Sequence, residues 1–174
     1  MSWEIHSSEI VYEAGIMKMR KNRSVNPRNG AAGDYFILHF PDWVTVLPFT
    51  KTGELVMIRQ YRHGSDTYEL EIPGGCVEPG EDPLKAGVRE LEEETAYVGG
   101  VPRLVGKVRP NTSTQDNWCY TLVIEGVELQ GQCNLDEGED IEVVLMSPAK
   151  VKEAIVAGEL TNAMMISSLY LAGV

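Results

Sequence analysis

The chain has no long hydrophobic run and no excess of positive charge. Its 174 residues include 15 lysines and arginines against 26 aspartates and glutamates, which gives a formal net charge of −11 at pH 7. Negative charge of this size repels phosphate backbones and anionic lipid headgroups. The apolar stretches at residues 43–49 and 163–174 are shorter than the roughly 20 residues that a membrane-spanning helix needs. We therefore expect neither nucleic acid nor a membrane as a partner.

Cysteine is also scarce. Cys76, Cys119 and Cys133 are odd in number and widely spaced, and they form no C-x-x-C pair. This pattern argues against a disulfide framework or a zinc knuckle and is typical of a protein in a reducing compartment. Residues 1–12 lack a basic segment followed by an apolar one, so we expect no signal peptide and a cytoplasmic location.

What is present is an ordinary globular composition, with 43% hydrophobic and 24% charged residues. The first half predicts strands, because β-branched and aromatic residues recur in short runs between turn residues. These runs lie at 9–12, 16–19, 35–39, 43–49 and 54–62. The sequence Ile72-Pro73-Gly74-Gly75 then predicts the end of any strand, since proline and glycine interrupt strands.

The clearest helix follows, with Asp82 as N-cap, Pro83 as first residue and an end near residues 95–97. We expect Leu84, Val88 and Leu91 to face the core, because they recur at helical spacing. Strands are predicted at 104–108, 118–125 and 141–146, and helices at 148–157 and 162–171. This order indicates an α+β fold, an α/β/α layered domain with a mixed sheet.

The predicted helix after Asp82 carries four glutamates within five residues. Glu90 lies three residues from Glu93 and four from Glu94, so these carboxylates project from one side of the helix. Such a face is either solvated or holds cations, and Mg²⁺ prefers carboxylate oxygens. Gly74 and Gly75 just upstream permit a close backbone approach, which favours a site over a solvated face.

The spacing from Gly75 onwards resembles the signature of the Nudix hydrolases, G-x5-E-x7-R-E-U-x-E-E-x-G-U, where U is a bulky apolar residue. Here it reads Gly75, Glu81, Arg89-Glu90-Leu91-Glu92-Glu93-Glu94 and finally Tyr97. A match over so many positions is far more specific than a lone glycine motif. It implies a Nudix fold, with a mixed central sheet flanked by helices and short N-terminal antiparallel strands beside it.

The resemblance also implies roles for the matched residues. The carboxylates of Glu90, Glu93 and Glu94 and the carbonyl of Gly74 would bind Mg²⁺, or Mn²⁺, against a diphosphate. The resemblance gives three further residues of this region, Gly75, Glu81 and Arg89, a structural role. An arginine paired with a carboxylate is first of all a geometric brace.

Ala96 replaces the last glycine of the signature. A glycine after a helix usually adopts a left-handed conformation, which costs other residues about 1 kcal/mol or more. We therefore expect this turn to take another shape, with the metal site intact.

The flanking sequence resembles the ADP-ribose and nucleoside-diphosphate-sugar pyrophosphatases, which carry Q-Y-R and then E-x-P-x-G ahead of the signature. By this resemblance Arg62 contacts the phosphates or terminal ribose of the substrate, and Glu71 lines the pocket. The later run Glu137-Gly138-Glu139-Asp140-Ile141 resembles E-x-E-D-I. It implies Glu137 as general base and Glu139 as a further metal ligand, and the reverse assignment stays open.

These resemblances imply a metal-dependent hydrolase that cleaves ADP-ribose or a related nucleoside diphosphate sugar into a nucleotide and a sugar phosphate. Pro110 lies about two residues nearer the signature than the proline typical of ADP-ribose enzymes. GDP-mannose, a dinucleotide or coenzyme A are therefore alternative substrates, and a non-catalytic sensor of nucleotide sugars is a further alternative. Relatives are commonly homodimers, so we expect residues 1–33 to form a dimerisation element beside a Nudix domain at 34–174.

Overall fold

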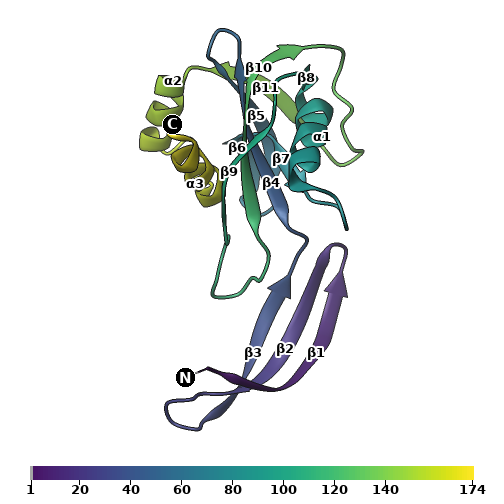
Figure 1. Ribbon diagram of the computed structural model, residues 1–174, viewed down its shortest axis with the longest axis vertical. Helices are drawn as coiled ribbons and strands as arrows, with labels where there is room; N and C mark the ends of the chain where they lie inside the picture. Colours follow the sequence, from purple (N-terminus) through teal and green to yellow (C-terminus); the bar gives the residue numbers. More distant parts are fainter. Residues whose placement is uncertain (1) are drawn as a thin grey trace. The chain divides into compact units, whose positions relative to one another are not determined.

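The computed structural model describes residues 2–174, in two compact units. One unit runs to Asp42 and includes Arg109–Trp118, and the other combines Trp43–Val108 with Cys119–Val174 (Figure 1). The first unit therefore extends past residue 33, the boundary that the sequence analysis gives. It also includes residues 109–118, from the middle of the sequence. No helix among residues 2–174 is both long and apolar enough to cross a membrane.

The first unit contains an antiparallel sheet in the order β1-β2-β3. Its strands are β1 (Glu4–Ala14), β2 (Met17–Val25) and β3 (Ala32–His39). The sequence predicts shorter strands here, because charged residues interrupt the apolar alternation. These charges contribute to the pairing instead, since Lys21 Nζ lies 3.0 Å from Glu9 Oε1 directly across the β1–β2 ladder. The segment 109–118 joins this sheet through Leu38, whose N–H donates to the Thr114 carbonyl at 2.7 Å.

The second unit is an eight-stranded mixed sheet between helices. Its main order is β11-β5-β4-β10-β8, with β6 on β5, β7 on β4 and β9 on β10. The strands are β4 (Trp43–Thr50), β5 (Leu55–Arg62), β6 (Thr67–Glu71), β7 (Gly74–Cys76), β8 (Tyr97–Val98), β9 (Arg103–Val108), β10 (Cys119–Leu129) and β11 (Ile141–Met146). Only the β4–β10 pair among these is parallel.

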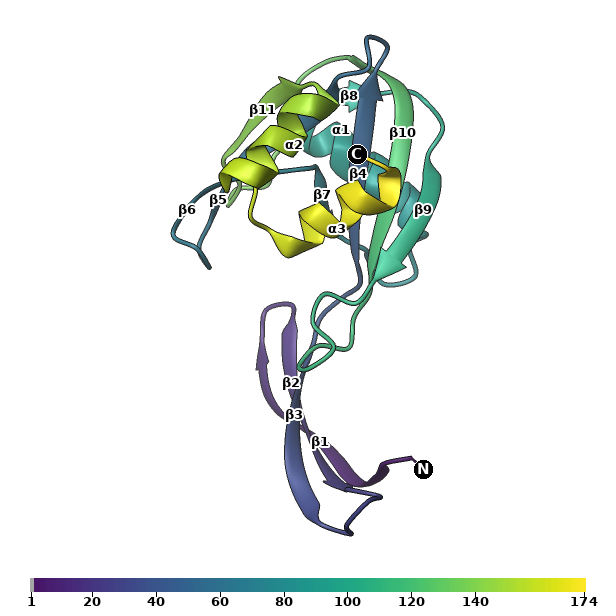
Figure 2. The same ribbon diagram turned by 90° about the vertical axis from the view of Figure 1, so that its left-hand side faces the viewer.

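Helices cover both faces of this sheet. Figures 1 and 2 show α1 (Pro83–Thr95) on one face, with α2 (Pro148–Ala157) and α3 (Ala163–Ala172) on the other. Two apolar cores result, one under α1 around Leu91 and Leu122 and the other under α2 and α3 around Leu47 and Leu169. The predicted α+β fold with a mixed sheet between helical layers is therefore confirmed.

One short strand contradicts the prediction that the sequence Ile72-Pro73-Gly74-Gly75 ends all strand structure. β6 does end at Glu71, just before this sequence, but β7 begins at Gly74 itself and pairs with β4. A Cβ on Gly74 would lie 2.2 Å from the carbonyl oxygen of Val44, so only glycine allows this close pairing. The glycine that predicts an interruption thus permits a strand that sequence propensity does not reveal.

The ends of α1 follow the sequence closely. The Asp82 side chain accepts a hydrogen bond from Leu84 N at 2.9 Å, and Pro83 is the first helical residue. The helix ends at Ala96, which adopts the left-handed conformation at φ 58° and ψ 14°. The expectation that alanine gives this turn another shape is wrong. Two backbone bonds hold Ala96 there, from its N–H to the Glu92 carbonyl and from Gln130 N–H to its own carbonyl.

The face of α1 that meets the sheet differs in part from the predicted one. Leu91 is buried, but Val88 is 39% exposed, so its predicted core position is wrong. The buried stripe runs instead through Gly87, Leu91 and Thr95, four residues apart. Because Gly87 has no side chain, α1 lies close enough to the sheet for this stripe to form the contact.

Replacing Gly87 by Ala tests this close packing. A helix-interior glycine-to-alanine change ordinarily stabilises by up to about 1 kcal/mol. Here the new Cβ would lie 2.3 Å from Leu122 Cδ1. We expect G87A to lower the free energy of unfolding by about 1–3 kcal/mol, as overpacked cores do, measured by urea denaturation. Lys85→Ala, on the exposed side of the same helix, is the control, and a G87A protein as stable as the wild type would contradict the packing.

Candidate active site

Arg89, on the second turn of α1, binds three carboxylates and a carbonyl. Its Nε and Nη2 donate to the two oxygens of Glu81 at 3.2 and 3.1 Å, and Nη2 also donates to the carbonyl of Cys76 at 3.1 Å. Its Nη1 donates to Glu90 at 2.8 Å and to Glu93 at 3.0 Å. The bonds to Glu81 depress the pKa of that carboxyl and raise the pKa of Arg89. One guanidinium therefore ties the loop before α1 to two of the clustered glutamates.

Gly75 supplies the space for the Glu90 carboxylate. A Cβ on Gly75 would lie 2.5 Å from the carboxyl carbon of Glu90, so any larger residue would displace this side chain. Burial raises the pKa of Glu90, although the charge and hydrogen bond of Arg89 oppose the shift. The Glu90 carboxylate is thus packed between the backbone of β7 and the guanidinium of Arg89.

Glu94 is the most deeply buried glutamate of the cluster, with 2% of its surface exposed. Its Oε2 accepts a hydrogen bond from Gly74 N at 2.9 Å. Burial raises the pKa of Glu94 to about 8, and the negative charges of Glu90 and Glu139 add to the shift against the opposing bond from Gly74. A carboxylate held here is destabilised by burial and like charge, and a cation would favour its ionised form.

The loop between β10 and β11 brings further carboxylates to the cluster. Asn134 N–H donates to the Glu93 carbonyl at 2.8 Å, which fastens the loop to the last turn of α1. Beyond this point Asp136 and Glu139 close a small turn, in which Glu139 Oε2 accepts from Asp136 N at 3.0 Å. Both side chains line the same cavity as Glu90 and Glu94.

Arg62, at the end of β5, reaches the same cavity. Its Nη2 donates to Glu71 Oε2 at 2.6 Å, and its Nε lies 3.3 Å from both oxygens of Glu71. Burial lowers the pKa of Arg62, but the hydrogen bonds and charge of Glu71 outweigh this effect and the net shift is upward. Arg62 therefore carries a fixed positive charge opposite the glutamates.

These side chains surround one cavity of about 330 Å³. Eight of the predicted site residues line it: Arg62, Gly74, Gly75, Arg89, Glu90, Glu93, Glu94 and Glu139. The other three do not line it: Glu71 lies behind Arg62, Glu81 lies behind Arg89, and Glu137 is an exposed residue on the same loop as Glu139. The cavity thus joins residues from β5, β7, α1 and the β10–β11 loop.

Comparison with known proteins shows the family of this chain. A model of the NUDIX domain matches residues 39–164, which is more than half of the chain. The chain belongs to the Nudix family. The family predicted from the signature is therefore confirmed.

Two similar proteins carry the names of the predicted subgroup. An ADP-ribose pyrophosphatase of Bacillus subtilis is 32% identical over 117 residues, which cover 67% of this chain and 63% of that protein. An ADP-sugar pyrophosphatase of Mus musculus is 34% identical over 160 residues, covering 80% and 71%. The chain thus spans less than two thirds of the Bacillus protein. A solved structure, described as an ADP compounds hydrolase, shares the fold with a TM-score of 0.87 at 22% identity, covering 99% of this chain and 92% of the other.

Nudix hydrolases generally use divalent metal ions, and the donors around the cavity fit a hard cation. Glu90, Glu93, Glu94 and Glu139 offer carboxylate oxygens, which Mg²⁺ and Mn²⁺ prefer. In residues 2–174 no three acidic, histidine or cysteine side chains already converge on one point. Arg89 holds Glu90 and Glu93, and the Gly74 N–H holds Glu94. A bound cation would therefore compete with Arg89 for two of its ligands.

Five residues that line the Nudix cavity were missed by the sequence analysis: Gln60, Cys76, Glu78, Asn134 and Asp136. Gln60 is the most informative of them, because it is 7% exposed and its amide oxygen has no hydrogen-bond partner in the described chain. It lies two residues before Arg62 on β5, and side chains two apart on a strand share a face. This alternation is the signal that could have placed Gln60 in the site with Arg62.

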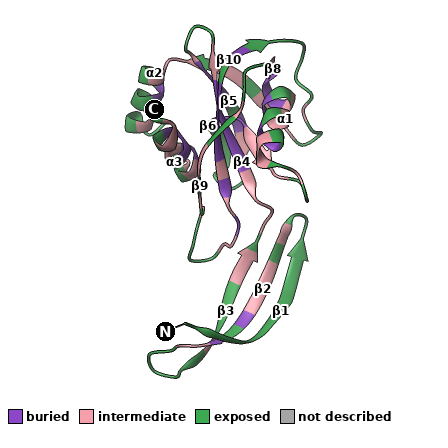
Figure 3. Ribbon diagram, viewed as in Figure 1, coloured by how far each residue is buried: buried purple, intermediate pink, exposed green. Residues whose placement is uncertain are grey.

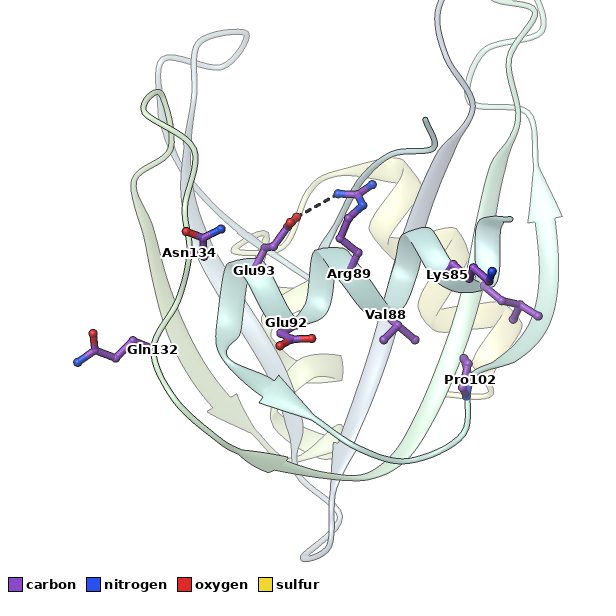
Figure 4. Close-up of a pocket in the computed structure, with 9 residues that line it drawn as sticks. Lys85, Val88, Arg89, Glu92, Glu93, Pro102, Gln132 and Asn134 are labelled. Atoms are coloured by element: carbon purple, nitrogen blue, oxygen red, sulfur yellow. Dashed lines mark hydrogen bonds and ion pairs between the residues drawn. The ribbon is translucent and has the colours of Figure 1, made fainter. Parts of the chain in front are cut away.

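A second cleft, of about 560 Å³, lies along the outer side of α1. Figure 4 shows Arg89 and Glu93 joined on one side of the helix, with Asn134 approaching Glu93 from the loop. Glu92 and Val88 point to the other side. Glu92, the one glutamate of the run with no role in the Nudix signature, thus points away from Arg89 and Glu93.

Replacing Gly75 by Ala tests the position of Glu90. The added Cβ would push away the mobile end of a side chain rather than backbone, so we expect the fold to persist. We expect Mn²⁺ affinity, measured by titration calorimetry, to fall about 10-fold or more, as it does when groups that orient metal ligands are changed. Gly64→Ala, where the new Cβ meets no atom within 4 Å, is the control. Unchanged Mn²⁺ affinity in G75A would mean that Glu90 is not a ligand.

Proposed function

We propose that this Nudix protein is a divalent-metal-dependent hydrolase that cleaves the diphosphate of ADP-ribose or a related nucleoside diphosphate sugar. The observation that carries the proposal is the single cavity where Arg62 faces the carboxylates of α1 and of the β10–β11 loop. The names of the similar proteins support the substrate class. We propose Mg²⁺ as the metal, with Mn²⁺ as a substitute.

In the proposed mechanism Glu90, Glu93, Glu94 and Glu139 would hold the metal, with the Gly74 carbonyl as a further ligand. When bound, it offsets the diphosphate charge and acidifies the attacking water. Arg62 donates to phosphate oxygens with the part of its guanidinium that Glu71 leaves available. Arg89 and Gly75 keep the Glu90 carboxylate in place, the first by its hydrogen bond and the second by the room that it leaves.

The bond changes are those of a hydrolysis. Glu137 takes a proton from the water, whose oxygen forms a bond to one phosphorus while the bond from that phosphorus to the bridging oxygen breaks. The bridging oxygen leaves on the other phosphate. From ADP-ribose the products are AMP and ribose 5-phosphate. Because Glu139 lines the cavity and lies two residues from Glu137, the exchange of their two roles is the alternative that variants must separate.

The first test is AMP release from ADP-ribose with and without Mg²⁺, with GDP-mannose as the competing substrate. We expect Mg²⁺-dependent AMP release. Preference for GDP-mannose would retain the site and change the substrate. A protein that binds both sugars and cleaves neither would be the non-catalytic sensor.

Glu94→Gln tests the metal site directly. Glutamine still accepts the bond from Gly74 N–H and stays neutral at every pH, so thermal stability without metal should not fall. We expect turnover to drop at least about 100-fold, since even groups behind a metal ligand contribute 10- to 100-fold. Glu92→Gln, two residues before Glu94 and on the side of the helix away from Arg89 and Glu93, is the matched control. Near-normal turnover in E94Q would contradict the ligand assignment.

We also propose that the N-terminal element, residues 1–33, holds two copies of the chain together as a homodimer. β1 is an edge strand and is exposed along its whole length (Figure 3). Exposed edges and exposed large apolar side chains are typical of interaction surfaces. In this unit the exposed large apolar side chains are Trp3, Ile5, Ile10, Val11, Tyr12, Ile16, Tyr35 and Phe36.

We include a cytoplasmic location in this proposal, supported by the lack of any disulfide among Cys76, Cys119 and Cys133.

Ile10→Lys tests the dimer, because a charge on an interface strand is costly to bury. We expect sedimentation velocity to give a dimer for the wild type and a monomer for I10K. Val156→Lys, at a site on α2 that is 89% exposed, is the control and should leave the dimer intact. A monomeric wild type at micromolar concentration would contradict the proposal.

A further inference from the structure

Glu71 is the buried partner of the arginine at the active site. Its side chain has no exposed surface, whereas 40% of the Arg62 side chain is exposed. The pair therefore has one end in the interior and one end in the cavity. A long arginine side chain loses about 2 kcal/mol of rotamer entropy when it is held in one place. Its direction in the cavity depends on how firmly Glu71 is itself held.

Asn162 is the residue that holds Glu71 from the other side. Its Nδ2 donates to Glu71 Oε1 at 3.1 Å, while its Oδ1 accepts from Met164 N at 3.0 Å as the N-cap of α3. Because the cap bond requires the oxygen to face the helix, the amide nitrogen faces Glu71. The oxygen of this amide thus caps α3, while its nitrogen binds Glu71.

The support behind Asn162 is rigid. α3 is anchored in the core by the buried side chains of Met165 and Leu169. The positive end of the helix dipole at Asn162 also favours a nearby carboxylate. The chain of contacts therefore runs from a packed helix through Asn162 and Glu71 to a guanidinium in the cavity.

One part of the guanidinium is left for a ligand. Glu71 takes bonds from Nε and Nη2 of Arg62, and Nη1 has no hydrogen-bond partner within the part of the chain that the structure describes. A bidentate hold of this kind fixes the plane of the guanidinium and therefore the direction of Nη1. A phosphate oxygen is the acceptor that suits it.

We infer that Asn162 is a positioning residue for the diphosphate: it fixes Glu71, which orients Arg62 toward the substrate. This inference rests on the proposed function for its substrate and adds a residue to which neither the signature nor the flanking motifs give a role. Without the amide, the Glu71 carboxylate can rotate, and Arg62 then samples directions in which Nη1 misses the phosphate.

Asn162→Ser separates this role from helix capping. Serine is as good an N-cap as asparagine, so the bond from Met164 N is kept, but its short side chain does not reach Glu71. We expect N162S to melt near the wild-type temperature and to raise KM for ADP-ribose about 3- to 10-fold, with kcat changed less than about twofold. Thr161→Ala is the matched control, because its hydroxyl donates to Glu69, two positions before Glu71 on β6, and not to Glu71 itself.

The decisive measurement is a double-mutant cycle with Arg62→Ala, read both as KM and as the calorimetric affinity for ADP-ribose. If Asn162 acts through Arg62, N162S changes neither quantity further in the R62A background. An equal effect in both backgrounds, or an unchanged N162S protein, would overturn the inference. Absence of cleavage by the wild type would overturn the proposed function, and the binding cycle would still decide the role of Asn162. A wild type that neither cleaves nor binds ADP-ribose overturns both.

Discussion

The guanidinium of Arg89 is the interaction on which the rest of the site depends. Glu90, Glu93 and Glu94 lie within two turns of one helix, where like charges repel each other. Arg89 offsets two of these charges and, through Glu81 and the Cys76 carbonyl, fixes the loop that leads into the helix. Because one planar group makes all these bonds, the loop and the carboxylates cannot move independently. The same contact therefore stabilises the local fold and sets the positions of the glutamates.

Glycine at three positions allows the close backbone packing on which this arrangement rests. Gly74 lets β7 pair closely with β4, Gly75 leaves room for Glu90, and Gly87 lets α1 lie against the sheet. Once α1 lies this close, Glu94 is carried inward to the Gly74 N–H, where it is buried. The unusual burial of a carboxylate is thus a consequence of close backbone packing, and its raised pKa follows from that burial.

The sequence predicts what is encoded locally. The start of α1 depends on Asp82 and Pro83, and the spacing of its glutamates depends only on helical geometry, so both are readable from a short window. β7 and the exposure of Val88 cannot be read from a short window. β7 requires a partner strand, and the exposure of Val88 depends on how closely Gly87 approaches Leu122. The motifs that flank the signature likewise imply Arg62 and Glu71 as site residues. Whether Glu71 faces the cavity or lies behind Arg62 depends on its tertiary contact with Asn162.

The charge balance of the cavity explains why a cation belongs to the proposed reaction. Six carboxylic acids line it, from Glu78, Glu90, Glu93, Glu94, Asp136 and Glu139, against the guanidinium groups of Arg62 and Arg89. Arg89 is already engaged with Glu81, Glu90 and Glu93, so Arg62 alone presents a positive charge that can reach a ligand. A diphosphate carries at least two negative charges of its own and would be repelled from such a surface. Divalent cations would offset this negative charge, while Arg62 would supply the direction that a spherical ion cannot. Affinity and orientation of the substrate would then be controlled by two different parts of the fold, α1 with its loop on one side and β5, β6 and α3 on the other.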